Sequence, residues 1–241
     1  MQIDSIYDKV YIRAKCFEGL FIHDISNLFH SISNAFELCI MSLKEGIRKE
    51  DILEYFKLIE EQVSRGKKLV RNFRKLSELE ESVMPLEPID LLKNLNNAVR
   101  FAKTNFPRRR IEIKINSEAK TIYVSANALL LDVFENIFIN SIRYNRNTLV
   151  QIEVSISEII ELNQKFTKLE FKDNGIGIEA TDKYEILQEG HRKSKESKGM
   201  GIGLSLVAML INLWEGKMWI EDRIRGDSSK GSNFIIIIPK A

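Results

Sequence analysis

Apolar residues in the N-terminal third of the chain recur at the spacing of long helices. One row alternates separations of four and three residues: Phe21, Ile25, Leu28, Ile32, Ala35 and Cys39. A second row repeats every seven residues: Ile22, Phe29, Phe36 and Leu43. After a turn near Gly46, the spacing returns in a third row: Ile52, Phe56, Ile59, Val63, Gly66, Val70 and Phe73. This pattern is typical of helices that pack lengthwise, and it predicts a helical hairpin.

The apolar rows of this hairpin are too extensive for two helices to bury. A single hairpin would leave long apolar stripes in contact with water, which is unfavourable. We therefore expect a homodimer in which two antiparallel hairpins form a four-helix bundle. A monomeric hairpin that folds against the rest of the chain is the alternative.

The pattern changes after two closely spaced prolines. Pro85 and Pro88 end the second helix, and they predict a boundary between a helical domain over 1–84 and a second domain over 85–241. Strict alternation over Arg109–Ile115 predicts a half-buried strand. Further strands are predicted at 121–124, 149–157, 167–172, 217–222 and 233–238, with helices at 90–105, 126–145 and 202–214 and a hairpin turn at Asn163–Lys165. The second domain is therefore expected to be an α/β sandwich with helices on one face of a mixed sheet, and the whole chain to be α+β.

Composition excludes several classes of protein. Of the residues, 44% are hydrophobic and 29% charged, as in globular proteins with a core. The 36 basic residues nearly balance the 34 acidic ones, which argues against nucleic acid or a membrane surface as a partner. Because no apolar run reaches about 18 residues, neither a membrane span nor a signal peptide is expected. The expected location is therefore cytoplasmic. Cysteine and histidine do not cluster at the spacing of a structural metal site.

Two glycine-rich stretches carry the first candidate chemistry. They are Asp173-Asn174-Gly175-Ile176-Gly177-Ile178 and Gly199-Met200-Gly201-Ile202-Gly203-Leu204, with a basic segment between them. Glycine lets a backbone pass close to a ligand, and a glycine-rich turn that enters a helix presents N–H groups to an anion. Together they predict a nucleotide site under a closing segment over 191–198. Taken singly, a stretch of this kind is more often a turn with a packing role, and the alternative for the basic segment is a solvated loop.

Polar side chains on two predicted helices add further candidates. His23 has Asp24 beside it and Asn27 one turn on; a carboxylate can hold the Nδ1 proton and leave Nε2 as a nucleophile. Asn136 and Asn140 lie one turn apart, and an amide oxygen is a suitable ligand for nucleotide-bound Mg²⁺. The ordinary alternatives are a solvated histidine and a capping role for the asparagines.

The order of these segments resembles the H, N, G1 and G2 boxes of two-component sensor histidine kinases. The matching residues are His23-Asp24, Asn136 with Asn140, Asp173-x-Gly175-x-Gly177 and Gly199-x-Gly201-x-Gly203-Leu204. The resemblance covers nearly the whole chain. It implies a dimerisation and histidine phosphotransfer hairpin joined to an ATP-binding domain of the Bergerat or GHKL type. The segments Glu221–Asp227 and Lys230–Phe234 also resemble kinases common in archaea.

The resemblance implies a role for each matching residue. His23 would be the phosphoacceptor, Asp24 its activating acid, and Asn27 the residue that places water for dephosphorylation of a response regulator. ATP and Mg²⁺ would be bound by Asn140 with Asn136 beside it, by Arg143 on the phosphates, by Tyr144 near the adenosine and by Asp173 on the adenine amino group. The other residues implied at the nucleotide site are Gly175, Gly177, Ser194, Lys195, Gly199, Gly201, Gly203 and Leu204.

Two departures from the family pattern leave alternatives open. Leu28 stands where the family usually has a proline, and only Tyr184, Ile186 and Leu187 are available for an F box. An ATPase of the gyrase kind would need a glutamate where this chain has Asn136, because Glu135 points about 100° away on a helix. A non-catalytic dimeric scaffold is the second alternative.

Overall fold

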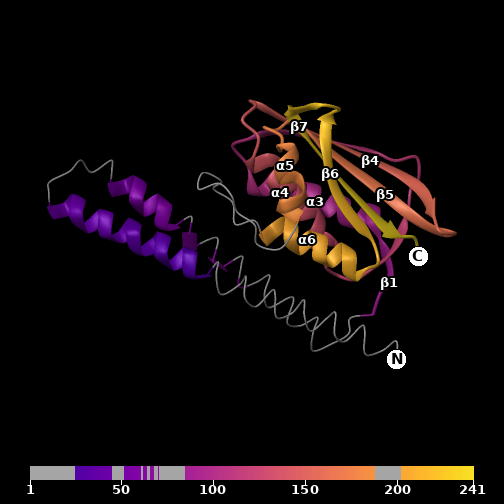
Figure 1. Ribbon diagram of the computed structural model, residues 1–241, viewed down its shortest axis with the longest axis horizontal. Coiled ribbons are helices and arrows are strands. Elements are labelled where there is room, and N and C mark those ends of the chain that lie inside the picture. Colours follow the sequence, from indigo (N-terminus) through magenta and orange to yellow (C-terminus); the bar gives the residue numbers. More distant parts are fainter. Residues whose placement is uncertain are drawn as a thin grey trace. The chain divides into compact units, whose positions relative to one another are not determined.

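The computed structural model describes residues 25–44, 52–60, 62–63, 66–67, 70, 85–187 and 202–241 (Figure 1). The chain divides into two compact units, with the change of unit between Val83 and Met84. Each unit is described by itself below. Among the described residues, no helix has the length and apolar character needed to cross a bilayer.

The described part of the first unit is a pair of helices. One helix covers 25–44, and the second is helical over 52–60 and at the described positions up to residue 70. Leu28, Ala35 and Cys39 are buried, as the four-three spacing predicts. A Cβ on Gly66 would lie 3.7 Å from Leu28 Cδ1. The beginning of the first helix therefore packs on the later part of the second, which makes the pair antiparallel, as predicted.

The predicted apolar row of the second helix divides between two faces. Ile52, Ile59 and Gly66 are half-buried, whereas Phe56, Val63 and Val70 are 52%, 42% and 51% exposed. Alternate members of the row therefore face the first helix, and the others form the apolar stripe that a single hairpin is expected to leave exposed.

The second unit is built on a five-stranded sheet in the order β2-β4-β5-β7-β6. Its strands are β2 (Arg110–Asn116), β4 (Leu149–Glu161), β5 (Gln164–Asp173), β6 (Lys217–Ile224) and β7 (Asp227–Pro239). β2 and β4 pair in parallel, and the remaining neighbours are antiparallel. The sheet is therefore mixed, as predicted.

Helices cover one face of this sheet (Figure 1). They are α3 (Leu91–Asn105), α4 (Leu130–Arg143), α5 (Ala180–Leu187) and α6 (Ile202–Leu213). α4 presents Phe134 and Phe138 to Phe171 of β5, with ring centroids 5.9 and 5.7 Å apart. These rings are fully or almost fully buried, so α4 is fixed on the sheet directly beside the end of β5.

Three local features differ from the sequence prediction. β1 (Glu87–Asp90) was not predicted; it pairs with β3 (Tyr123–Ala126) in a separate two-stranded sheet, where Pro88 is tolerated because the strand is an edge. α5 was not predicted either, since it is short and weakly amphipathic. The hairpin turn predicted at Asn163–Lys165 is present but begins one residue earlier: Leu162 and Asn163 form it with positive φ, 47° and 64°, and Gln164 already pairs with Glu161.

Candidate nucleotide-binding site

The carboxylate of Asp173 at the end of β5 is the centre of the candidate site. The residue is 4% exposed. Its Oδ1 accepts hydrogen bonds from the backbone N–H groups of Gly175 (2.8 Å) and Ser232 (3.2 Å), and its Oδ2 accepts one from Ser141 Oγ (3.1 Å). Burial raises the pKa of Asp173 above its ordinary value, although these three donors oppose the rise. A buried carboxylate whose pKa is raised because its charged form is poorly solvated is typical of a functional site.

The loop after Asp173 is pressed against the end of α4. Ile176 N donates to Tyr144 O at 3.0 Å. A Cβ on Gly175 would lie 2.8 Å from Tyr144 O and 2.9 Å from Asp173 Oδ1. Because real Cβ atoms do not approach that closely, Gly175 is required for this contact.

Gly177 is fixed by a different segment. Its φ is +73°, and a Cβ there would lie 1.5 Å from Ser228 O near the start of β7. Both Gly175 and Gly177 therefore serve close backbone approach, as the sequence predicts, but the partners are segments of the protein itself.

The asparagines of α4 face the start of α6. A Cβ on Gly203 would lie 3.2 Å from Asn136 Oδ1 and 3.8 Å from Asn140 Nδ2. Asn136 is buried and its Nδ2 donates to Asp132 O at 2.8 Å, whereas Asn140 is half-buried. The structure thus brings together Asn136, Asn140 and Gly203 from the two predicted boxes.

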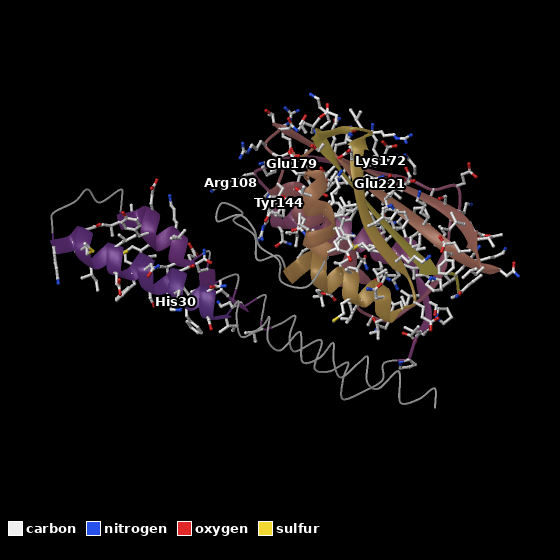
Figure 2. All side chains as sticks on the ribbon, in the orientation of Figure 1. His30, Arg108, Tyr144, Lys172, Glu179 and Glu221 are labelled. Atoms are coloured by element: carbon white, nitrogen blue, oxygen red, sulfur yellow. The ribbon has the colours of Figure 1, made fainter. Side chains whose placement is uncertain are left out.

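The remaining predicted residues on α4 and α6 lie around this cluster. Arg143 ends α4 and is exposed, and Tyr144 follows it as the C-cap residue, 38% exposed (Figure 2). Leu204 is buried in the first turn of α6. Tyr144 therefore offers ring surface to a ligand, while Leu204 belongs to the core.

Several predicted residues lie outside the described residues. These are His23, Asp24, Ser194, Lys195, Gly199 and Gly201. Asn27 is described: it is half-buried on the helix over 25–44, and its carbonyl accepts from Ser31 Oγ at 2.9 Å. Within the described part of the chain, histidine, cysteine and acidic side chains form no group of three or more suited to a metal ion.

Three sets of contacts near the site were missed by sequence reasoning. Ser141 is 2% exposed and bonds Asp173 across 32 residues of sequence. Asn174 Oδ1 accepts from Asn145 Nδ2 at 2.7 Å and from Gln151 N at 2.8 Å. Arg109 donates to the carbonyls of Asn145 and Asn147. The only sequence signal was the run of asparagines between a predicted helix and a predicted strand.

Comparison with known proteins places this site in a family. Residues 125–241 match the family model described as histidine kinase-, DNA gyrase B-, and HSP90-like ATPase. The chain is 22% identical over 224 residues to cyanobacterial phytochrome A of Nostoc sp., which covers 90% of this chain and 27% of that protein. It is 23% identical over 228 residues to phytochrome-like protein Cph1 of Synechocystis sp., covering 93% and 29%. The chain therefore spans between a quarter and a third of the length of these curated relatives.

Solved structures of similar fold include two histidine kinases. Histidine kinase AdeS of Acinetobacter baumannii matches with a TM-score of 0.57 at 18% identity, over 88% of this chain and 96% of that chain. The nucleotide-free catalytic domain of histidine kinase ThkA matches with a TM-score of 0.55 at 19% identity, over 65% of this chain and 97% of that chain. These likenesses show the fold.

The fold and the family match together define the class of the second unit, which is an ATPase domain of the histidine kinase-, gyrase B- and HSP90-like kind. Its homologues are sensor histidine kinases, and the chain carries a histidine kinase catalytic domain preceded by a helix pair. The predicted fold class and the resemblance to sensor histidine kinases are thus confirmed.

Proposed function

We propose that this chain is an ATP-dependent protein histidine kinase that phosphorylates itself on His23 and passes the phosphoryl group to an aspartate of a response regulator. The observation that carries this proposal is the placement of Asp173, Asn140 and Gly203 around α4. A buried acceptor for a base, an amide oxygen for a cation and a helix start for phosphates are the three parts that recognition of Mg²⁺-ATP requires.

The side chains divide the work of binding. Asp173 accepts a hydrogen bond from the adenine amino group. Three donors of the protein already occupy the other acceptor positions of the carboxylate. Tyr144 covers the adenosine, and Arg143 meets the phosphates. The oxygen of Asn140 holds Mg²⁺, which when bound offsets negative charge on the phosphates. Ser194, Lys195, Gly199 and Gly201 are assigned to a segment that closes over the triphosphate.

The proposed reaction is an in-line displacement. Nε2 of His23 forms a bond to the γ-phosphorus while the bond from that phosphorus to the β,γ-bridging oxygen breaks, and ADP leaves with the electron pair. Asp24 keeps the proton on Nδ1, so that Nε2 carries the lone pair. Placement of the two reactants supplies much of the rate, as in other phosphoryl transfers. The boundary at 84–85 separates the domain that carries His23 from the domain that binds ATP.

The exposed faces of the helix pair support a homodimer. Phe29, Phe36 and Leu43 repeat every seven residues on the first helix and are 64%, 56% and 68% exposed. The second helix exposes its own seven-residue row: Phe56, Val63 and Val70. Two apolar stripes at heptad spacing fit a second hairpin, because a four-helix bundle would cover both at once.

Transfer of label from γ-labelled ATP tests the proposal directly. With Mg²⁺, the wild-type chain should acquire protein-bound phosphate that is labile to acid and stable to base, as expected of phosphohistidine. His23→Gln should acquire none. His30→Gln is the matched control, because His30 is an exposed histidine on the helix over 25–44 (Figure 2), and it should label normally.

The other outcomes separate the competing functions. A chain that binds ATP without becoming labelled would be a scaffold, and steady release of inorganic phosphate without labelling would be the activity of a gyrase-type ATPase. The second outcome is disfavoured, because the residue one turn before Asn140 is Asn136, whose amide cannot take a proton from water. Label that persists in His23→Gln would show that the phosphoacceptor has been misassigned.

Phosphatase activity on the regulator is proposed for Asn27. Asn27→Ala should keep autophosphorylation within twofold and slow the loss of phosphate from the regulator. Equal loss of both activities would contradict this role, since it would point to a disturbed helix instead of a misplaced water.

A further inference from the structure

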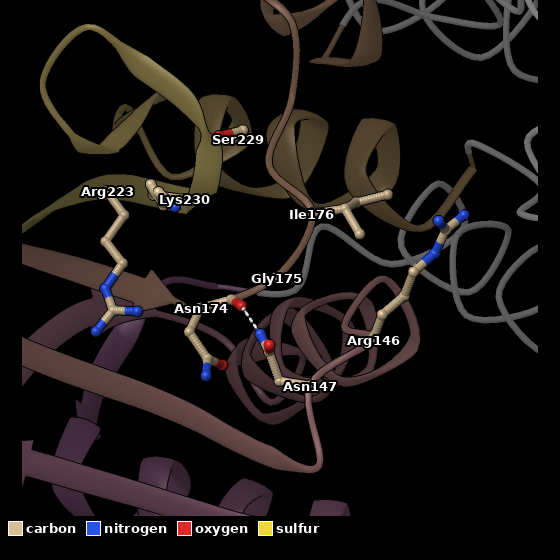
Figure 3. Close-up of a pocket in the computed structure, with 8 residues that line it drawn as sticks. All are labelled: Arg146, Asn147, Asn174, Gly175, Ile176, Arg223, Ser229 and Lys230. Atoms are coloured by element: carbon tan, nitrogen blue, oxygen red, sulfur yellow. Dashed lines mark hydrogen bonds between the residues drawn. The ribbon is translucent and has the colours of Figure 1, made fainter.

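The connection between α4 and β4 is tied to the residue that follows Asp173 by two asparagine side chains. Asn145 is 2% exposed, and its Nδ2 donates to Asn174 Oδ1 at 2.7 Å. Asn147 Nδ2 donates to the backbone carbonyl of Asn174 (Figure 3). These two bonds hold the side chain and the main chain of the same residue, so Asn174 cannot turn or shift without breaking at least one of them.

Asn174 is held from β4 as well. Its N–H donates to Gln151 O at 3.1 Å, its Oδ1 accepts from Gln151 N at 2.8 Å, and its Nδ2 donates to Leu149 O at 3.0 Å. The paired register of β4 and β5 ends at Ile152 and Asp173, so these bonds continue the contact by one residue. Because both ends of the Asn174 amide are engaged, its orientation is fixed, and its oxygen is the end that accepts from the connection.

Arg109 supports the backbone of the same connection. Its Nη2 donates to the carbonyls of Asn145 at 2.7 Å and of Asn147 at 3.2 Å. Asn147 N donates to Asn145 Oδ1 at 3.0 Å, so the two asparagines are also bonded to each other. A buried amide with both ends bonded is a rigid support, because any movement leaves a polar group without its partner, which is unfavourable.

Links on both sides of one glycine join this connection to the loop that carries the buried carboxylate. Asn145 bonds Asn174 on one side, and Ile176 N donates to Tyr144 O at 3.0 Å on the other. Between them lies Gly175, whose N–H donates to Oδ1 of the carboxylate at 2.8 Å. The position of that N–H, and with it the direction in which the carboxylate is held, therefore depends on the residues on either side of Gly175.

We infer that Asn145 and Asn147 are positioning residues for recognition of the base: acting through Asn174 and Gly175, they aim the carboxylate of Asp173 at the 6-amino group of adenine. This role rests on the proposed function, in which Asp173 accepts that amino group. A hydrogen bond weakens steeply when its direction is wrong. A turned carboxylate therefore lowers the affinity for a base with an amino group and leaves the contacts of the rest of the nucleotide unchanged.

Calorimetric titration of the full chain with two nucleotides tests this role. ADP carries the 6-amino group, and purine riboside diphosphate carries hydrogen in its place. The wild type should bind ADP about tenfold or more tightly than the analogue, as expected for a hydrogen bond to a charged group. In Asn145→Ala the Kd for ADP should rise about fivefold, while the Kd for the analogue should change by less than about twofold, because only the directed bond is lost. A purely structural role would weaken both nucleotides by the same factor.

Asn147→Ala is the second variant, because Asn147 is exposed and its truncation leaves no buried cavity. It should lower the preference for ADP in the same direction, even if Asn145→Ala does not fold. Asn116→Ala is the matched control: Asn116 Nδ2 donates to Glu153 Oε1 at 2.7 Å, at the end of β2 away from this connection. Loss of that bond should change neither Kd by more than about twofold, as for a surface substitution away from the site.

Two results would overturn the role of the asparagines alone. One is a wild-type preference for ADP that both asparagine variants keep, and the other is equal weakening of ADP and the analogue in both variants. Equal binding of the two nucleotides by the wild type would instead overturn the assignment of Asp173 to the base in the proposed function, and the role of the asparagines with it.

Discussion

The hydroxyl of Ser141 offers a sharp test of the role of Asp173. It is the only one of the three donors to that carboxylate that comes from a side chain, so Ser141→Ala removes it without touching the backbone. A hydrogen bond to a charged group contributes about 1.5–3 kcal/mol. Its loss makes the carboxylate harder to ionise, and the pKa of Asp173, already raised by burial, rises further.

The expected consequence is a pH-dependent loss of nucleotide affinity. In the proposed site the adenine amino group donates to the ionised carboxylate, so affinity should be present above the folded-state pKa of Asp173 and fall as the pH drops through it. In Ser141→Ala this fall begins at a higher pH. At neutral pH we expect ADP to bind roughly three- to tenfold more weakly, about 0.6–1.4 kcal/mol, because solvent and ligand replace part of the lost bond.

Calorimetric titration of ADP between pH 5.5 and 8.5 checks this expectation. Ser125→Ala is the matched control, since Ser125 is half-buried on β3, and its profile should be that of the wild type. Equal loss of affinity by Ser141→Ala at every pH would refute the electrostatic reasoning, because it would show that the hydroxyl supports only the shape of the site.

Asp173→Asn examines the same carboxylate through stability. Because the folded-state pKa is raised, the stability that this group contributes is fully present below its unfolded pKa and is lost as the pH rises through the folded pKa. The neutral asparagine keeps an oxygen for Gly175 and Ser232 and can donate to Ser141. Its Tm should therefore exceed that of the wild type by a few degrees at neutral pH, with about 2–4 °C for each kcal/mol. The difference should vanish near pH 4, and ADP binding should be lost throughout.

The remaining predictions concern contacts and turns within each unit taken by itself. If the proposed dimer forms, Phe36→Lys should convert it to a monomer in light scattering, whereas Met41→Lys, about 140° away on the helix, should not. Leu162→Asn should raise the Tm by about 2–4 °C, because asparagine tolerates the positive φ of this fully exposed turn residue better than leucine. Lys183→Met should lower the free energy of unfolding by about 1 kcal/mol through loss of the ion pair that ties α5 to Asp222 of β6, and the double variant with Asp222→Asn should recover part of it.

Local sequence pattern predicted the elements whose burial is regular. Apolar and polar residues alternate along β2, and α3 and α4 are strongly amphipathic. The apolar run at the end of β7 is typical of a strand inside a sheet. The pattern failed where burial is partial. β1 has four residues and contains Pro88, so neither length nor alternation marks it as a strand; its partner β3 creates it by pairing.

The residues of the candidate site were predictable where they lie within one short sequence motif. Asp173 and Gly175 belong to one short segment, and Asn136 and Asn140 to one helix face. Ser141 could not be predicted in the same way, because a serine inside a helix has no local signal and its partner is 32 residues away. The bonds from the connection between α4 and β4 to Asn174 span 27 and 29 residues of sequence, and nothing in this spacing along the chain brings the two segments together.

The loop that carries Asp173 is positioned by the end of α4 and by two segments of β7 that hold none of the family motifs. Tyr144 O binds it from the end of α4, Ser232 N donates to its carboxylate from β7, and Ser228 O occupies the space that a side chain at position 177 would need. The hairpin between β6 and β7 is therefore part of the nucleotide site in a mechanical sense. A substitution in that hairpin acts on Asp173 through backbone contacts, and its effect should be sought in nucleotide affinity before it is sought in phosphoryl transfer.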